Sequence, residues 1–144
     1  EPYVAKGVQQ GLFVKWIAQS NYNILQTGFI IFGQKMVEDR DLAERWLTAY
    51  LKGTRAYLDA FGPKRINRDE AVSIMTKYTV DKDPKLYDIM EMPYFDPNGV
   101  PDKKSMDAVY KWFVAQGLYK GKTTFDDLLD LSFVNNAAQK LGKQ

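Results

Sequence analysis

The sequence lacks cysteine and histidine altogether, because neither occurs among its 144 residues. The chain therefore offers no disulfide, no thiolate nucleophile, no imidazole base and none of the sulfur or imidazole ligands that bind zinc and haem. Carboxylates and lysines remain, but the expectation of catalysis falls, and we predict no enzymatic activity, no catalytic residue, no cofactor and no metal site. Because the chain has no cysteine, it is compatible with either an oxidising or a reducing compartment.

A strong excess of charge and long apolar runs are also absent. The 20 basic and 18 acidic residues leave a net charge of +2, far from the positive field that binding to a phosphate backbone needs, so a nucleic-acid partner is disfavoured. No stretch approaches the roughly 20 apolar residues of a membrane span. The hydrophobic fraction of 45% is typical of a folded globular protein, and the length suits one domain.

Two short apolar stretches predict strands. The first is residues 12–17, LFVKWI. The second lies within residues 20–33, SNYNILQTGFIIFG, where Leu25 and Phe29–Phe32 form a nearly continuous apolar run that Gly33 ends. The second is apolar at successive positions, as in a strand that is covered on both faces. Two strands alone make a poor sheet, so we expect partner strands outside this chain.

The remainder has the apolar spacing of amphipathic helices. The longest pattern ends at Gly62-Pro63, and Asp41 with Glu44 resembles a capping box at its start. A tight turn is predicted at residues 96–99, DPNG. The predicted helices cover residues 2–10, 41–61, 67–78, 84–90, 106–116, 123–130 and 132–142.

Three features have both a structural and a functional interpretation. Asp126, Asp127 and Asp130 lie close together, but their spacing is not that of a calcium loop, and carboxylates at a helix start stabilise its dipole. The aromatic residues of MPYF, residues 92–95, cover a core edge or line a recognition surface. Glu1, before Pro2, either caps a helix or accepts hydrogen bonds from a ligand.

An ordered set of stretches resembles the solute-binding proteins of ABC transporters, in the family that serves nitrate, taurine, alkanesulfonates and thiamine pyrimidine precursors. The stretches span essentially the whole chain. In order, they are EPYVAKGVQQG, TGFIIFG, LAERWLTAYLKGTRAYLDAF, NRDEAVSIMTKYT, MPYFDPNG, WFVAQGLYKGK and DDLLDLSFVNNAAQKLG.

The resemblance implies an α/β, helix-rich chain that forms the C-terminal fragment of a two-lobed, periplasmic-binding-protein-like (type II) fold. Residues 1–144 are then a single unit of a larger solute-binding protein. Within it, residues 1–24 end the second lobe and form the crossover, and residues 25–144 complete the first lobe with the C-terminal helices. The opening at Glu1 would then lie in mid-protein.

The function implied by the resemblance is that of the substrate-binding component of an ABC importer. Such a protein captures a small organic or anionic solute between its lobes and delivers it to a permease of the inner membrane. It is periplasmic or held at the cell surface, and its export signal is not in this chain. Glu1 is the first candidate ligand contact, and Tyr22 and Asn23 follow. The uncovered strand predicts self-association of the fragment. The alternative function is a stand-alone helical protein-interaction module.

Overall fold

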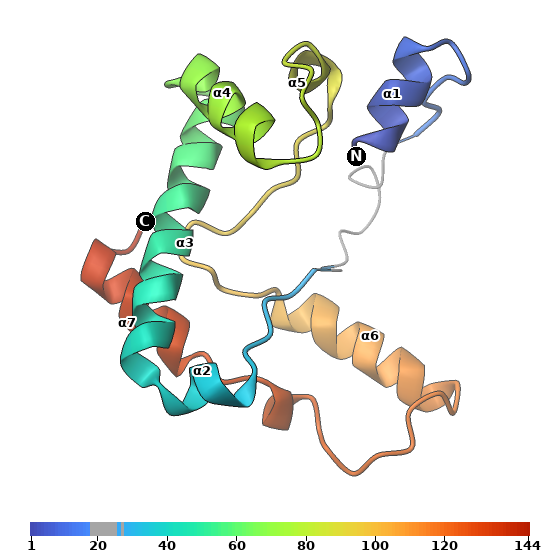
Figure 1. The fold of residues 1–144 in the computed structure, drawn as a ribbon. Helices are drawn as coiled ribbons and strands as arrows, with labels where there is room; N and C mark the ends of the chain where they lie inside the picture. Colours follow the sequence, from blue (N-terminus) through green and yellow to red (C-terminus); the bar gives the residue numbers. More distant parts are fainter. Residues whose placement is uncertain (18–25, 27) are drawn as a thin grey trace. The chain divides into compact units, whose positions relative to one another are not determined.

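The computed structural model describes residues 1–17, 26 and 28–144, and Figure 1 shows their arrangement along the chain. The helices are α1 (Tyr3–Gln9), α2 (Gln34–Glu38), α3 (Arg40–Phe61), α4 (Arg68–Tyr78), α5 (Leu86–Ile89), α6 (Lys103–Ala115), the 3₁₀ helix η2 (Asp126–Leu128) and α7 (Ser132–Leu141). Within this part of the chain no helix is long and apolar enough to cross a membrane.

The predicted α/β fold is wrong for this chain, because the structure is 56% helix and has no strand among the described residues. Residues 13–17 and 28–33 have no regular secondary structure, and Leu25 lies outside the described residues. A β-strand is stabilised by hydrogen bonds to a neighbouring strand. In the described residues neither segment has such a neighbour, so the apolar runs that predicted strands remain unpaired.

The helix predictions are confirmed where the apolar period is long. The pattern from residue 41 to residue 61 forms α3, and those predicted from residues 67 and 106 form α4 and α6. Gly117, in the left-handed region with φ of 67°, ends α6, where Leu118 N–H donates to the carbonyl of Phe113 at 3.0 Å. The turn at residues 96–99 is also confirmed, because Gly99 N–H donates to the carbonyl of Asp96 at 3.0 Å.

The chain divides into two compact units. The first contains residues 1–18 and 53–95, and the second contains residues 19–52 and 96–144. In the first unit, Leu86 and Tyr87 of α5 are buried, and the Tyr87 hydroxyl donates to the carbonyl of Asp81 at 3.2 Å. Lys6 of α1 forms an ion pair with Asp81. These contacts join α1 to the segment around α5.

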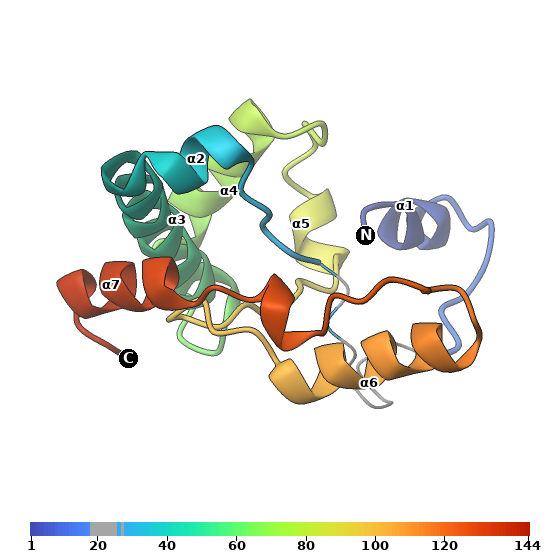
Figure 2. The same ribbon diagram turned by 90° about the horizontal axis from the view of Figure 1, so that it is seen from below.

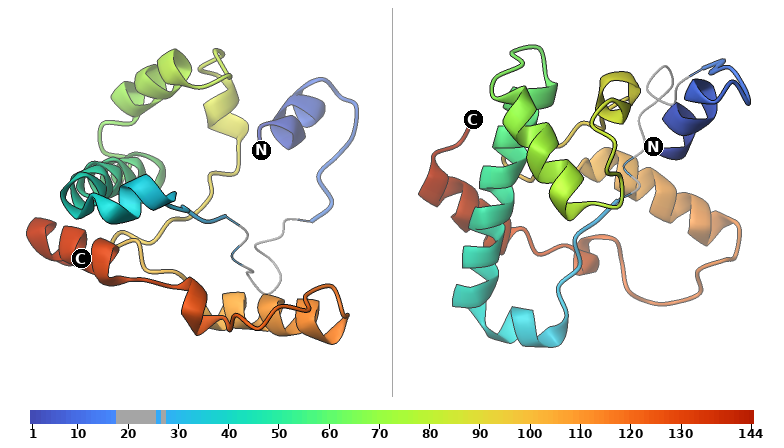
Figure 3. Two further views of the ribbon diagram at one scale, coloured as in Figure 1. Left: turned by 60° about the horizontal axis from the view of Figure 1, so that its bottom comes forward. Right: turned by 45° about the horizontal axis from the view of Figure 1, so that its top comes forward.

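The core of the second unit lies between α7 and the first part of α3, which lie side by side in Figures 2 and 3. Helical spacing places one apolar stripe of each helix against the other. Phe32, before α2, packs edge-on against Trp46 of α3 and Phe133 of α7. The buried residues of this core are Ala43, Leu47, Leu51, Phe133, Val134, Ala137 and Ala138.

Candidate functional site

A buried carboxylate, Glu44, is the centre of a polar cluster on α3 and α7. It lies on α3, and its side chain is 10% exposed. Oε1 accepts hydrogen bonds from Arg40 Nε at 2.9 Å and from Asn136 Nδ2 at 2.8 Å, and Oε2 accepts one from Lys140 Nζ at 2.8 Å. Asn136 and Lys140 are four residues apart on α7 and therefore share one face of that helix. The cluster joins α7 to α3 beside the apolar core.

These donors control the ionisation of Glu44. The hydrogen bond from Lys140, followed by that from Asn136, lowers the pKa of Glu44 from 4.5 to about 2. The carboxylate is therefore ionised throughout the physiological range. A permanently ionised carboxylate whose two oxygens are both occupied is poorly suited to act as a proton donor, and we assign it a structural role.

A shallow depression of about 300 Å³ adjoins this cluster and is lined by Glu44, Asn136, Gln139 and Lys140. Asn136 and Lys140 use the polar atoms that face Glu44 to hold the two helices together. The depression offers a ligand few polar groups that are not already engaged, so it is a weak candidate for a binding site.

A second depression, of about 460 Å³, lies between α4 and α5 in the first unit. Arg68 is its most buried charged group, with a side chain 18% exposed. Its Nη2 lies 2.7 Å from Asp88 Oδ1 and donates to the carbonyl of Tyr87 at 2.9 Å. Its Nε is buried and, within the described part of the chain, has no hydrogen-bond partner. The guanidinium lies 5.6 Å from the ring of Phe61, so cation–π attraction partly offsets the lost hydrogen bond.

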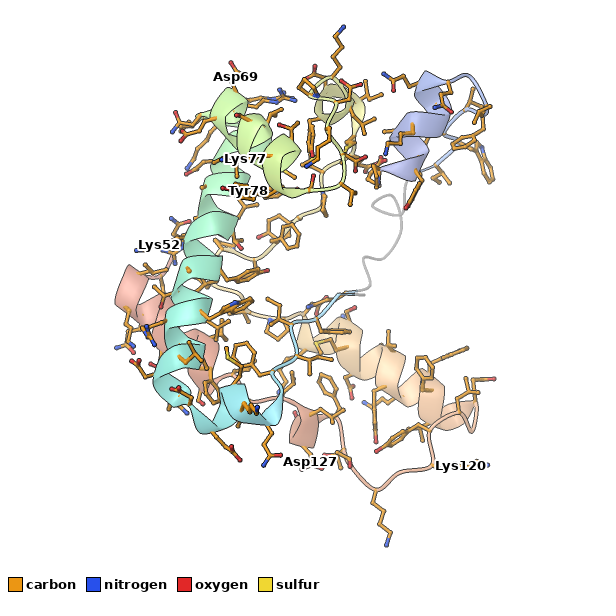
Figure 4. All side chains as sticks on the ribbon, viewed as in Figure 1. Lys52, Asp69, Lys77, Tyr78, Lys120 and Asp127 are labelled. Atoms are coloured by element: carbon orange, nitrogen blue, oxygen red, sulfur yellow. The ribbon has the colours of Figure 1, made fainter. Side chains whose placement is uncertain are left out.

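The depression between α4 and α5 also carries opposite charges on its rim. Asp69 and Lys85 line it together with Ser73, Thr76, Val72 and Pro84. Asp69 lies at the start of α4, with Lys77 and Tyr78 at the other end of that helix, as Figure 4 shows. Because Arg68 is already neutralised by Asp88, the depression has no uncompensated buried charge to select an anion.

Glu1, the first of the predicted ligand contacts, is hydrogen-bonded within the first unit. Its Oε2 accepts from the backbone N–H of Ala5 at 2.9 Å, and its Oε1 accepts from that of Glu91 at 3.2 Å. The first bond caps α1, which is the structural role considered for this residue. The second ties the start of the chain to the segment after α5. Tyr22 and Asn23 lie outside the described residues.

The aspartates near α7 each have a separate partner. Asp127 accepts from the Thr124 hydroxyl at 2.6 Å, Asp126 lies 3.0 Å from Lys103 Nζ, and Asp130 accepts from Ser132 N–H at 2.9 Å. These bonds lower the pKa of Asp127 and of Asp130. Within the described residues no group of three ligating side chains is arranged to hold a metal ion.

The two aromatic residues of MPYF, residues 92–95, lie in different environments, and each fits a different one of the two interpretations. Phe95 packs edge-on against Tyr57, with ring centroids 5.3 Å apart, and the Tyr57 hydroxyl donates to the carbonyl of Pro93 at 2.8 Å. Burial of that hydroxyl raises the pKa of Tyr57 to about 12. Tyr94 is 76% exposed. Phe95 thus covers a core edge, while Tyr94 is available for recognition.

The sequence pattern did not predict the role of Glu44. It assigned Glu44 to a capping box, but Asp39 caps α3 by accepting from Leu42 N–H at 3.0 Å. The donors Asn136 and Lys140 are 92 and 96 residues away, and only their spacing of four residues signalled a shared helix face.

Searches with protein-family models, among characterised proteins and among solved structures found no significant match to this chain.

Proposed function

We propose that this chain belongs to the ligand-capturing component of an ABC importer, and that it helps to bind a small organic or anionic solute. The observation that carries the proposal is the order of seven stretches, from EPYVAKGVQQG to DDLLDLSFVNNAAQKLG, which resemble the solute-binding family along essentially the whole sequence. The proposal rests on this sequence pattern and does not rest on the α/β fold, which the helical structure contradicts.

The exposed apolar segments support a role within a larger protein. Val14 and Trp16 are 86% and 90% exposed, and Ile31 is 86% exposed. Exposed apolar residues in contiguous segments mark surfaces that another chain or another part of the same chain covers. In this proposal the component is exported to the periplasm or the cell surface and delivers its solute to an inner-membrane permease.

Solute capture requires no catalytic step. A solute that binds one conformation more tightly than another shifts the population toward the first. Glu1 is the proposed contact from this chain, with Tyr22 and Asn23 as weaker candidates. A carboxylate has about four acceptor positions, and the bonds from Ala5 and Glu91 use two of them. Glu1 therefore retains acceptor capacity for a solute that donates hydrogen bonds.

The test uses the product of the natural gene. Its intact mass gives the length of the protein, and thermal unfolding is followed with nitrate, taurine, an alkanesulfonate and a thiamine pyrimidine precursor. We expect a longer, exported protein that one class of solute stabilises in a saturable way, by about RT ln(1 + [L]/Kd). In that protein, Glu1→Gln should weaken binding at least about tenfold, which corresponds to the loss of one charged hydrogen bond.

The control for this test is Glu38→Gln, which changes an exposed carboxylate on α2 that accepts a hydrogen bond from Gln34 in its own helix. This variant should bind the solute as the unchanged protein does. A gene product of these 144 residues alone that no solute stabilises would contradict the proposal.

A helical protein-interaction module is the second candidate function, and the surface aromatics favour it. Tyr94 is 76% exposed, and Trp112 and Phe113 of α6 are 55% and 44% exposed. Aromatic residues of this kind are frequent anchors of protein interfaces. This candidate gains support if the gene encodes only this chain and no solute binds.

A further inference from the structure

The segment of residues 28–32, GFIIF, is a short apolar run whose backbone is unpaired. Phe29, Ile30 and Ile31 are 52%, 47% and 86% exposed. In the described part of the chain no backbone hydrogen bond involves residues 29–32. A segment whose backbone N–H and C=O groups are unpaired can pair with another segment once both are extended.

One end of the segment is held in place. Phe32 is half-buried against the core of the second unit, with its ring 5.7 Å from Trp46 and 6.1 Å from Phe133. At the other end, Gln26 N–H donates to the Ser105 hydroxyl at 2.7 Å, and the Gln26 side chain accepts from Asp102 N–H at 2.7 Å. Ordering before binding lowers the entropic cost of association.

Within the segment, residues 29–32 form a palindrome. Reading FIIF from either end gives the same residues, so two antiparallel copies would place Phe29 opposite Phe32 and Ile30 opposite Ile31. Aromatic pairs and β-branched pairs directly across from each other are among the favourable cross-strand pairs. Residues 26–34 carry no charge, so no like charges oppose each other in this register.

We propose that two copies of this chain associate through antiparallel pairing of residues Phe29–Phe32 about a two-fold axis between Ile30 and Ile31. The partner is a second copy because the palindromic, uncharged segment is complementary to itself, and a two-fold interface uses the same patch on both copies. Pairing supplies hydrogen bonds to the unpaired backbone and removes the exposed isoleucines from water.

Sedimentation velocity between about 1 and 100 µM tests the association. We expect a monomer–dimer equilibrium for the unchanged chain. Ile31→Lys should raise the dimer dissociation constant at least about tenfold, because it replaces both apolar Ile30–Ile31 cross-strand pairs with a lysine opposite an isoleucine. Val80→Lys is the matched control, since Val80 is 87% exposed and lies outside the segment. A monomer at all concentrations, or equal effects of the two variants, would overturn the proposal.

Cross-linking tests the register, and the absence of cysteine makes each introduced cysteine unique. Residues directly opposite each other in an antiparallel pair have Cα atoms about 4.5–5.5 Å apart, within the range of a disulfide. A mixture of Ile30→Cys and Ile31→Cys chains should therefore form mixed disulfides faster than either variant pairs with itself. Equal rates for the mixed and the identical pairs, or equal rates with Val80→Cys, would contradict the antiparallel register.

Discussion

Replacing Leu51 with alanine should destabilise the second unit by about 2–5 kcal/mol, the largest loss that we expect from one substitution in this chain. Leu51 is fully buried on α3 and belongs to the core that α3 forms with α7. Truncation removes buried methyl groups and leaves a cavity that two helices and the turn at Gly99 cannot readily fill. Urea unfolding followed by circular dichroism measures the change.

The control for this prediction is Leu128→Ala in the same unit. Leu128 is 64% exposed on η2, so its truncation should cost about 1 kcal/mol or less. If Leu51→Ala and Leu128→Ala lowered the unfolding free energy equally, the assignment of the core to α3 and α7 would be wrong.

Acid should remove the stabilisation that Glu44 provides. The folded-state pKa of Glu44 is lowered from 4.5 to about 2, chiefly by the hydrogen bond from Lys140. A carboxyl with a lowered folded-state pKa stabilises the protein fully above its unfolded pKa, and this contribution disappears as the pH falls through the folded value. The contribution is therefore complete above pH 4.5 and lost by about pH 2.

Glu44→Gln isolates this contribution. The variant should be less stable than the unchanged chain at pH 7, because Lys140 and Arg40 lose a charged partner. The difference in unfolding free energy should shrink below pH 4.5 and vanish near pH 2, where Glu44 itself becomes protonated. Thermal unfolding across this range measures the difference.

Glu38→Gln serves as the matched carboxylate control, since it removes an exposed charge on α2. The difference in unfolding free energy between Glu38→Gln and the unchanged chain should stay constant from pH 7 to pH 2. A constant difference between Glu44→Gln and the unchanged chain across the same range would show that the carboxylate does not act through its charge.

The helices could be predicted from sequence because their signals are local. Apolar residues at spacings of three and four define α3, α4 and α6, and Gly117 and Gly142 end helices in the left-handed region. The absence of strands from the described residues could not be predicted, because an apolar run such as GFIIF indicates only that its residues favour burial. Whether such a run forms a strand depends on a neighbour that a single sequence does not specify.

In the candidate site, too, only local interactions could be predicted from the sequence. The sequence offered a helix cap and a ligand contact as alternative roles for Glu1, and the structure places its carboxylate on Ala5 N–H. Glu44 could not be identified, because its donors reach it through the packing of α7 on α3. Glutamates in a first helical turn commonly form capping boxes, so local rules assigned this one to the wrong partner.

The proposed dimer predicts that the backbone amides of residues 29–31 gain hydrogen bonds when two copies associate. In one copy of the chain their amides have no hydrogen-bond partner in the described residues, whereas in the proposed dimer they pair with a second copy. Hydrogen exchange read by mass spectrometry on the peptide containing residues 28–33 tests this most directly. We expect exchange close to the rate of an unstructured peptide at about 1 µM and protection at about 100 µM. Strong protection at both concentrations would contradict the account, because it would show that the segment is already paired within a single copy.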